Sequence, residues 1–349
     1  DTVDFPTAYG SDIYAGHRPA ADAAAVAALR DAGALVIGKS VSTEFAYWQA
    51  GKTRHPLNPA HTPGGSSSGS AAAVAAGMVP LAIGSQTAAS TIRPAAYCGI
   101  VGFKPSQGLI SLAGVKALAG SLDTVGVFAR DGAGVAAIAA VLTGRPDLAD
   151  SPPAHGPFTF RLADAAEWAQ VDADALVRTR DAAARLAAAG AEVVDRPAPA
   201  PFDNLVPVQS LIMAWEAARD LAHERLAHGT RVSQSVRDLF HQARDIPARA
   251  HDDACRIRDA AVADLERLFD GADFLLAPSA TGEAPRREDG TGNPDLSRAW
   301  TLLGLPSLTL PLGPGAGGLP LGLQVAARPR QDHRLLAAAA WLEAALTAG

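Results

Sequence analysis

The residues best suited to chemistry are two groups of serines in a glycine- and serine-rich stretch, residues 62–105. One group lies in a turn at residues 64–70 and the other in a turn at residues 85–90. Serine is a poor nucleophile at neutral pH, so it needs a partner that takes its proton and preorganised N–H groups that hold the oxyanion. The stretch could supply one serine as nucleophile, a second as proton relay and a tight turn for the oxyanion.

Two short elements must bring these turns together. An alanine-rich helix pattern separates them, and the apolar run at residues 79–83 predicts a strand. Such a loop–helix–strand–loop unit can place two distant serines at one edge of a sheet. Around this unit, helix patterns alternate with short apolar runs, which indicates an α/β fold. The expected strands include residues 34–37, 100–103, 158–162, 191–194, 273–277, 302–312 and 321–325, and the expected helices include residues 19–32, 134–142, 172–189 and 332–346.

Composition and charge narrow the class of protein. The chain has 349 residues, 48% hydrophobic and 19% charged, as is ordinary for a globular protein. A net charge of −6 argues against a nucleic-acid partner, and no apolar run approaches the roughly 20 residues of a membrane span. Two cysteines are too few for a disulfide framework, so we expect a cytoplasmic protein. These features therefore argue against a nucleic-acid surface and against a membrane span.

Three segments of the stretch carry a family resemblance. They read Gly64-Gly65-Ser66-Ser67-Ser68-Gly69-Ser70, Gly84-Ser85-Gln86-Thr87-Ala88-Ala89-Ser90 and Arg93-Pro94-Ala95-Ala96-Tyr97-Cys98-Gly99. Together they resemble the signature of the amidase signature family, which are Ser–Ser–Lys amide hydrolases. Residues 300–306 and 318–324 resemble the closing strands of that family. The resemblance implies a large mixed, mostly parallel sheet covered by helices on both faces.

The resemblance also implies roles for individual residues. Ser90 resembles the nucleophile, and Ser66 resembles the relay serine that a cis peptide bond holds. The amides of Thr87, Ala88, Ala89 and Ser90 would form the oxyanion hole, and no metal or organic cofactor is implied. The family usually carries two glycines where this chain has Ala88 and Ala89. Alanine keeps its N–H, but its Cβ narrows the site and restricts the backbone angles.

The catalytic lysine is the residue that the resemblance does not place in this sequence. The family carries it in a Pro-Val-x-x-Lys-Asp stretch, which here would fall just before Asp1. We therefore expect an N-terminally truncated amidase domain over residues 1–349, folded in its central part but catalytically impaired. Lys39 is an alternative base because it ends the expected strand at residues 34–37. The matching segment of the family, however, is structural.

Several residues allow more than one interpretation. Residues 65–69 fit G-x-S-x-G, with Ser67 as the nucleophile of an α/β-hydrolase elbow, but residues 61–63 do not predict the strand that this motif requires. A flexible loop and a phosphate cradle are further alternatives, although no Gly-Lys-Ser/Thr ending follows. Asp123 either orders the loops of the site or caps a turn. Arg93 either positions the turn of Ser90 or is solvated or ion-paired, and Cys98 is expected to be a buried apolar residue.

The predicted function is the hydrolysis of a carboxylic amide to an acid plus ammonia or an amine, with a small-molecule, non-peptide amide as substrate. One alternative is the A subunit of a glutamine amidotransferase, which would need a partner chain. Another is a catalytically dead fragment of the amidase fold that only binds or scaffolds. Residues 152–277 are expected to be a variable, mostly helical region that shapes the substrate pocket. The sequence leaves open whether the protein forms a homodimer.

Overall fold

The computed structural model of the chain describes residues 1–150, 156–163 and 168–347. Its strands are β1 (Leu81–Gln86), β2 (Val101–Lys104), β3 (Thr124–Ala129), β4 (Thr159–Leu162), β5 (Glu192–Asp195), β6 (Phe274–Pro278), β7 (Ser307–Pro314) and β8 (Pro320–Ala326). Its α-helices are α1 (Ala24–Asp31), α2 (Ser68–Ala75), α3 (Ile92–Cys98), α4 (Gly132–Thr143), α5 (Asp147–Asp150), α6 (Ala173–Ala188), α7 (Leu205–Asp220), α8 (Ala222–His228), α9 (Gln234–Arg244), α10 (Ala248–Ala263), α11 (Leu265–Phe269), α12 (Asp295–Leu302) and α13 (Asp332–Thr347). Residues 152–155 and 164–167 of the expected variable region lie outside the described residues.

Local signals explain where helices begin and end. The side chain of Asp131 accepts a hydrogen bond from the amide of Gly134 and so caps the start of α4. Gly144 ends the same helix in the left-handed conformation, with φ of 63°. Helix α6 buries alanine, threonine and leucine side chains along one face, which is the pattern that its sequence predicted. The expected helices thus form, with ends that shift by a few residues.

The strands form one mixed sheet of eight in the order β1-β3-β2-β7-β8-β6-β4-β5. The α/β class is therefore confirmed, but the expectation of mostly parallel pairing is wrong. Only β4 pairs in parallel, with β5 and β6, and the other neighbours within this sheet are antiparallel. Wholly apolar strands indicate burial on both faces of a sheet, and such burial does not determine strand direction.

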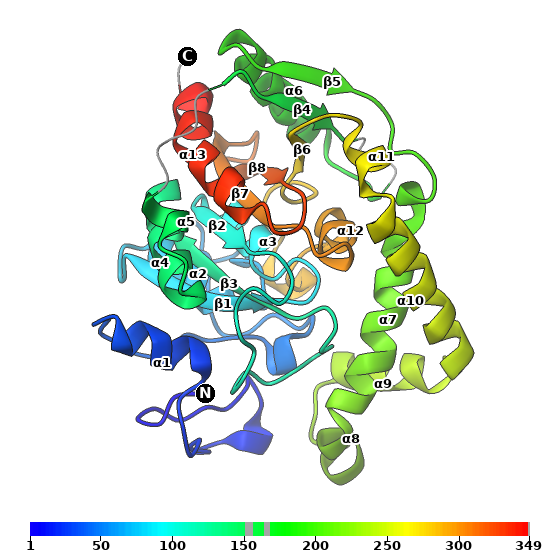
Figure 1. Cartoon of the computed structure of the whole chain (residues 1–349). Coiled ribbons are helices and arrows are strands. Elements are labelled where there is room, and N and C mark those ends of the chain that lie inside the picture. Colours follow the sequence, from blue (N-terminus) through cyan, green and yellow to red (C-terminus); the bar gives the residue numbers. More distant parts are fainter. Residues whose placement is uncertain (151–155, 164–167, 348–349) are drawn as a thin grey trace.

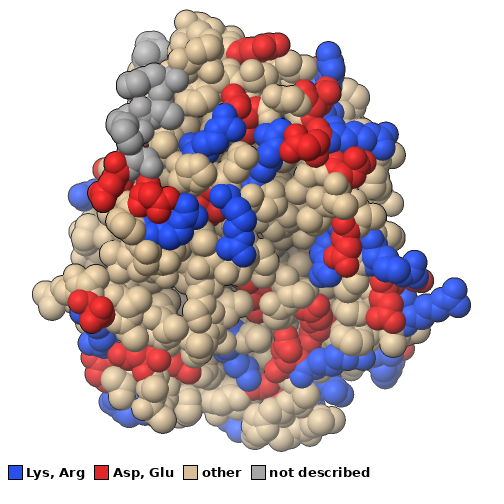
Figure 2. Space-filling model, in the orientation of Figure 1, with Lys and Arg blue, Asp and Glu red and all other residues tan. Residues whose placement is uncertain are grey.

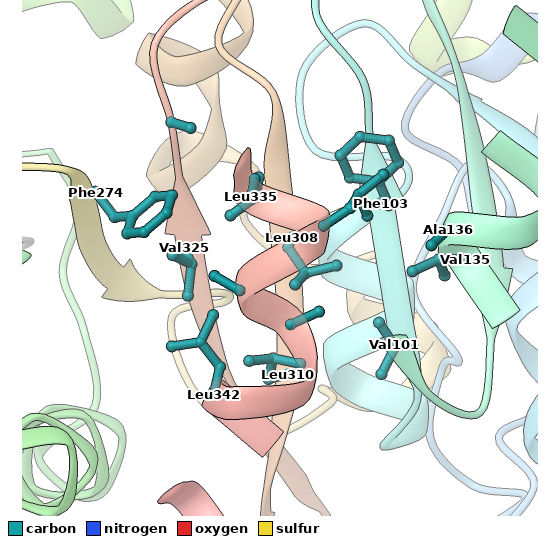
Figure 3. Close-up of a cluster of buried hydrophobic side chains, with 14 of the residues drawn as sticks. Val101, Phe103, Val135, Ala136, Phe274, Leu308, Leu310, Val325, Leu335 and Leu342 are labelled. Atoms are coloured by element: carbon teal, nitrogen blue, oxygen red, sulfur yellow. The ribbon is translucent and has the colours of Figure 1, made fainter. Parts of the chain in front are cut away.

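Helices cover both faces of this sheet, so alternate side chains of a strand enter different cores. On one face, α4, α6 and α13 pack against β2, β7 and β8. Figure 3 shows this core, with Leu335 and Leu342 of α13 lying over Leu308 and Leu310 of β7 and Val325 of β8. On the other face, α2 and α3 cover β3 beside the serine-rich stretch, and α7, α10 and α12 cover the strands beyond.

The region after β5 builds a helical arm. Helices α7, α9 and α10 lie side by side and extend away from the sheet (Figure 1). In the parts of the chain that the structure describes, no helix is long and apolar enough to cross a membrane. Figure 2 shows acidic and basic side chains intermingled on the face in view, without a broad area of one sign.

The strand expected at residues 34–37 does not form. These residues have no ladder partner among the described residues, and Leu35 and Ile37 are 89% and 69% exposed. Strand β1 consequently ends the sheet, and most of its residues are only half-buried. An apolar run becomes a strand only where it pairs with a neighbour, and residues 34–37 do not pair with the free edge of β1.

Candidate active site

The two serine turns flank strand β1 and lie on the same side of the sheet. The first turn leads into α2 and the second into α3. Gly84 allows the first turn to lie directly on β1, because a Cβ at this position would be 2.3 Å from the hydroxyl oxygen of Ser67. That hydroxyl donates to the carbonyl of Ser85 and accepts from its amide, both at 3.2 Å. The expected loop–helix–strand–loop unit is therefore present.

Both candidate serines line one small cavity of about 30 Å³. Ser66 and Ser90 share its wall with Thr87, Ala88 and Ala89, so the structure brings together all of the site residues that the sequence predicted. The peptide bond between Gly65 and Ser66 is cis. Among the described residues, no group hydrogen-bonds the hydroxyl of either serine, although both residues are buried. Catalytic hydrogen bonds often become short only in the complex with substrate.

The turn at residues 87–90 is held by its carbonyl groups, while its amides stay free. The carbonyl of Thr87 accepts from the side chain of Gln209 at 2.8 Å, and that of Ala88 accepts from the hydroxyl of Thr301 at 2.7 Å. The carbonyl of Ala89 accepts from the amide of Arg93 at 3.0 Å. No acceptor in the described part of the chain binds the amides of Thr87, Ala88, Ala89 or Ser90. Buried amides without partners are rare, so this turn offers donors to a ligand.

The side chain of Gln86 also holds this turn in place. Its side-chain oxygen accepts from the amides of Thr91 and Ile92, at 2.9 and 3.1 Å, and so holds the start of α3. Its side-chain nitrogen donates to Thr301 at 3.0 Å. Neither Ala88 nor Ala89 has a positive φ, so the two alanines fit the turn without the backbone freedom of glycine.

Arg93 connects the two serine turns. Its guanidinium is buried and donates to the carbonyl of Gly65 at 2.8 Å, to the hydroxyl of Thr291 at 3.1 Å and to the carbonyl of Gly292. Burial lowers the pKa of Arg93 to about 10, so the group stays charged at neutral pH. Of the two expected roles the structure shows positioning, because Arg93 binds the residue before Ser66 and belongs to the helix that follows Ser90.

Asp123 takes both of the roles that the sequence left open. Its carboxylate accepts from the hydroxyl of Thr87, in the second serine turn, and from the amides of Leu118 and Ala119, at 2.8 and 3.2 Å. Burial raises the pKa of Asp123 to about 6, although these three hydrogen bonds oppose the shift. Asp123 thus caps the turn at residues 118–119 and fixes Thr87 to it.

None of the four lysines of the chain lines the cavity. Lys39 donates to the hydroxyl of Thr7 at 2.7 Å, and Lys116 pairs with the buried Glu224 at 2.6 Å. Lys52 is exposed. Lys104 is fully buried on β2, where its ammonium donates to the carbonyl of Pro105 at 2.8 Å and burial lowers its pKa to about 7. A base for Ser66 is therefore not found among these lysines.

The structure adds residues that the sequence did not single out. Gln209 and Met213 reach the turn and the cavity from α7, and Arg298 reaches the cavity from α12. Tyr47 and Trp48 line it from the aromatic-rich segment near the N-terminus. No local motif marks Gln209 or Arg298, because their role depends on how distant helices pack. Cys98 is buried, as expected, and no three His, Cys, Asp or Glu side chains among the described residues gather to hold a metal ion.

Comparisons with known proteins agree with this geometry. The family model described as Amidase matches residues 1–336. The chain is 33% identical to the A subunit of the Glutamyl-tRNA(Gln) amidotransferase from Symbiobacterium thermophilum, over 96% of this chain and 78% of that protein. Its structure is similar to that of a crystallised amidase, with a TM-score of 0.87 and 30% identity over 98% of this chain and 82% of the other.

It is also similar to a structure from a vestigial protein complex that reveals the origins of an s-triazine catabolic enzyme. The TM-score is 0.89, with 28% identity over 99% of this chain and 81% of that one. The match of the family model over most of the sequence, the fold and the two serine turns lead to one conclusion. The chain belongs to the amidase family, that of the amidase signature enzymes.

Proposed function

We propose that this protein hydrolyses a carboxylic amide to an acid plus ammonia or an amine, through an acyl-enzyme on Ser90. One observation carries the proposal. At the turn before Ser90, three consecutive carbonyls are bound by other groups, while the adjoining amides are free and belong to residues that line the cavity of both serines. Amides fixed in this way stabilise the negative oxygen that develops when a hydroxyl attacks a carbonyl carbon.

The proposed reaction has two halves. In the first, the hydroxyl oxygen of Ser90 bonds to the amide carbon and the proton of Ser90 passes to Ser66. The amides of residues 87–90 hold the oxyanion. Collapse of this intermediate breaks the C–N bond, and Ser66 donates a proton to the leaving nitrogen. In the second half, water attacks the acyl group on Ser90 and releases the acid.

The relay also needs a group that accepts the proton of Ser66. The four lysines of the chain bind elsewhere in this structure, so the proposal assigns none of them this role. The rate of amide hydrolysis by the chain alone therefore depends on how well some other base accepts the proton of Ser66 in place of a positioned lysine. Positioned proton transfer typically contributes about 10²–10⁴-fold to a rate.

A second candidate is the A subunit of a glutamine amidotransferase, in which the ammonia passes to a partner chain. Curated relatives favour this candidate over a free-standing amidase, because two that are 33% and 31% identical to the chain are A subunits of Glutamyl-tRNA(Gln) amidotransferase. Under either candidate we propose one amidase domain over residues 1–349. Residues 152–277 shape the substrate pocket within it, which is supported by Met213 in the wall of the cavity and by the hydrogen bond from Gln209 to Thr87.

The test measures ammonia release from a panel of small primary amides and from glutamine, by the purified chain and by any stable complex that co-purifies with it. Release from small amides by the chain alone would support the free-standing amidase. Release from glutamine only in a stable complex with a second protein would support the amidotransferase. If neither occurs, and a fluorophosphonate probe fails to label Ser90, both proposals are wrong and the scaffold alternative remains.

We expect Gln209→Glu to lower kcat about 10-fold or more with little change in KM. The new carboxylate can still accept from Arg298, but it cannot donate to the carbonyl of Thr87, so the turn loses one of its ties. An oxyanion hole acts mainly in the transition state, so its distortion lowers kcat rather than substrate binding. Steady-state kinetics on the best amide would show this.

Thr301→Val is the matched change on the neighbouring carbonyl, that of Ala88, and should act in the same direction. The control is Ser210→Ala, which removes a hydroxyl on α7 that only donates back to the carbonyl of Val206. Unchanged kcat in Gln209→Glu would show that the turn keeps its shape without this tie.

A further inference from the structure

The wall of the cavity is positively charged. Arg93 and Arg298 are its charged residues, and no carboxylate lines it. Arg298 is balanced by Asp295, whose carboxylate is 2.8 Å from Nε. Within the described residues Arg93 has no carboxylate partner and binds only carbonyls and a hydroxyl. Since a buried charge is costly without a counter-charge, a cavity of this kind favours an anionic ligand.

Arg298 keeps one of its donor groups free. Its Nε binds Asp295 and its Nη1 binds the side-chain oxygen of Gln209. No group in the described parts of the chain hydrogen-bonds its Nη2. The side chain is only 11% exposed, and it lies in the wall of the cavity that both serines share. Its fixed position leaves one N–H edge available to a substrate.

Tyr47 adds a second donor to the wall of this cavity. It lines the same cavity, and its hydroxyl has no hydrogen-bond partner among the residues described. Burial raises the pKa of Tyr47, and the charge of Arg298 acts in the opposite sense. A guanidinium N–H and a phenol O–H that belong to the wall of one small cavity and have no partners suit the two oxygens of a carboxylate.

We propose that the substrate is a short amide whose acyl chain ends in a carboxylate, and that Arg298, with Tyr47, binds this carboxylate while Ser90 attacks the amide carbon. This inference rests on the proposed function and names the substrate class of the same site. The cavity is small, at about 30 Å³, which argues against a bulky acyl chain. Through Gln209, Arg298 is also connected to the carbonyl of Thr87, so a bound carboxylate would act on a residue that holds the oxyanion turn.

The experiment compares succinamate, an anionic amide, with pentanamide, a neutral amide of similar length. Titration calorimetry on Ser90→Ala measures binding without turnover, and steady-state hydrolysis on the unmodified chain measures catalysis. We expect succinamate to bind more tightly than pentanamide. Adding Arg298→Met to Ser90→Ala should weaken succinamate binding about 10- to 100-fold and leave pentanamide binding nearly unchanged. Arg298→Lys, which keeps the charge but not the fork, should recover part of the loss.

The control is Arg244→Met on α9, because the side chain of Arg244 is 74% exposed. This variant should change the binding of neither succinamate nor pentanamide. Equal affinity for the two ligands, or equal losses of both in Arg298→Met, would overturn the inference by showing that Arg298 is only structural. Hydrolysis of pentanamide without preference for succinamate would overturn it too, yet leave the amidase proposal intact. Absence of binding and of hydrolysis for every amide would overturn both.

Discussion

Replacing Ser90 with alanine should abolish amide hydrolysis, with a loss on the order of 10⁶-fold, as for the nucleophile of a serine hydrolase. Ser90 lies at the end of the turn with four free amides, so its hydroxyl is the one placed to form a bond beside the oxyanion donors. A fluorophosphonate probe should label the same residue covalently. Intact mass and peptide mapping of the labelled protein would identify the position.

The control for Ser90 is Ser67→Ala. The hydroxyl of Ser67 exchanges hydrogen bonds with the backbone of Ser85, and Ser67 does not line the cavity. Loss of this hydroxyl should lower the stability of the fold but not the reactivity of Ser90, so the probe should still label Ser90. Label on Ser67 instead would contradict the proposal and restore the elbow interpretation of residues 65–69.

The second large effect is expected for Ser66→Ala, which should reduce the rate by about 10²–10⁴-fold or more. Ser66 shares the cavity with Ser90, and Arg93 connects the residue before it to the helix that begins after Ser90. Because the two serines would act as one relay, the double variant should be little slower than Ser90→Ala alone. Rates of all three variants on one amide decide this.

Ser68→Ala is the matched control, since the neighbouring hydroxyl donates to the carbonyl of Val41 and lies outside the cavity wall. If Ser66→Ala kept most of its turnover, Ser66 would be a serine of the loop and not a proton relay.

Local chemistry explains what the sequence could predict. The serine turns, the helix and strand between them and most flanking elements are encoded by neighbouring residues, such as the cap of Asp131 on α4. The pairing of strands is not encoded in this way. Residues 34–37 have the composition of a buried strand but are exposed, because strand formation depends on a neighbour and not on composition alone.

The residues of the site also divide into those that local sequence predicts and those that depend on distant packing. The positions of Ser66 and Ser90 follow from one continuous stretch, which is why both could be predicted. Gln209 binds the turn across a separation of 122 residues, and nothing in the sequence around it distinguishes it from other polar residues of a helix. Arg298 likewise joins the cavity only because α12 packs against α7. Residues that shape a pocket from distant helices need the tertiary structure to be found.

The fully buried ammonium of Lys104 makes the stability of this fold depend on pH. Its pKa is about 7 in the folded chain and near 10.5 when unfolded, so between these values unfolding takes up a proton. Stability from this group is therefore complete above about pH 10.5 and falls as the pH drops to 7, by up to about 5 kcal/mol. Asp332 offsets part of the shift. The free energy of unfolding can be measured with urea at several pH values. Lys104→Met should flatten its dependence on pH, whereas the exposed Lys52→Met should not. Parallel curves for the unmodified protein and both variants would show that Lys104 keeps its proton in the fold.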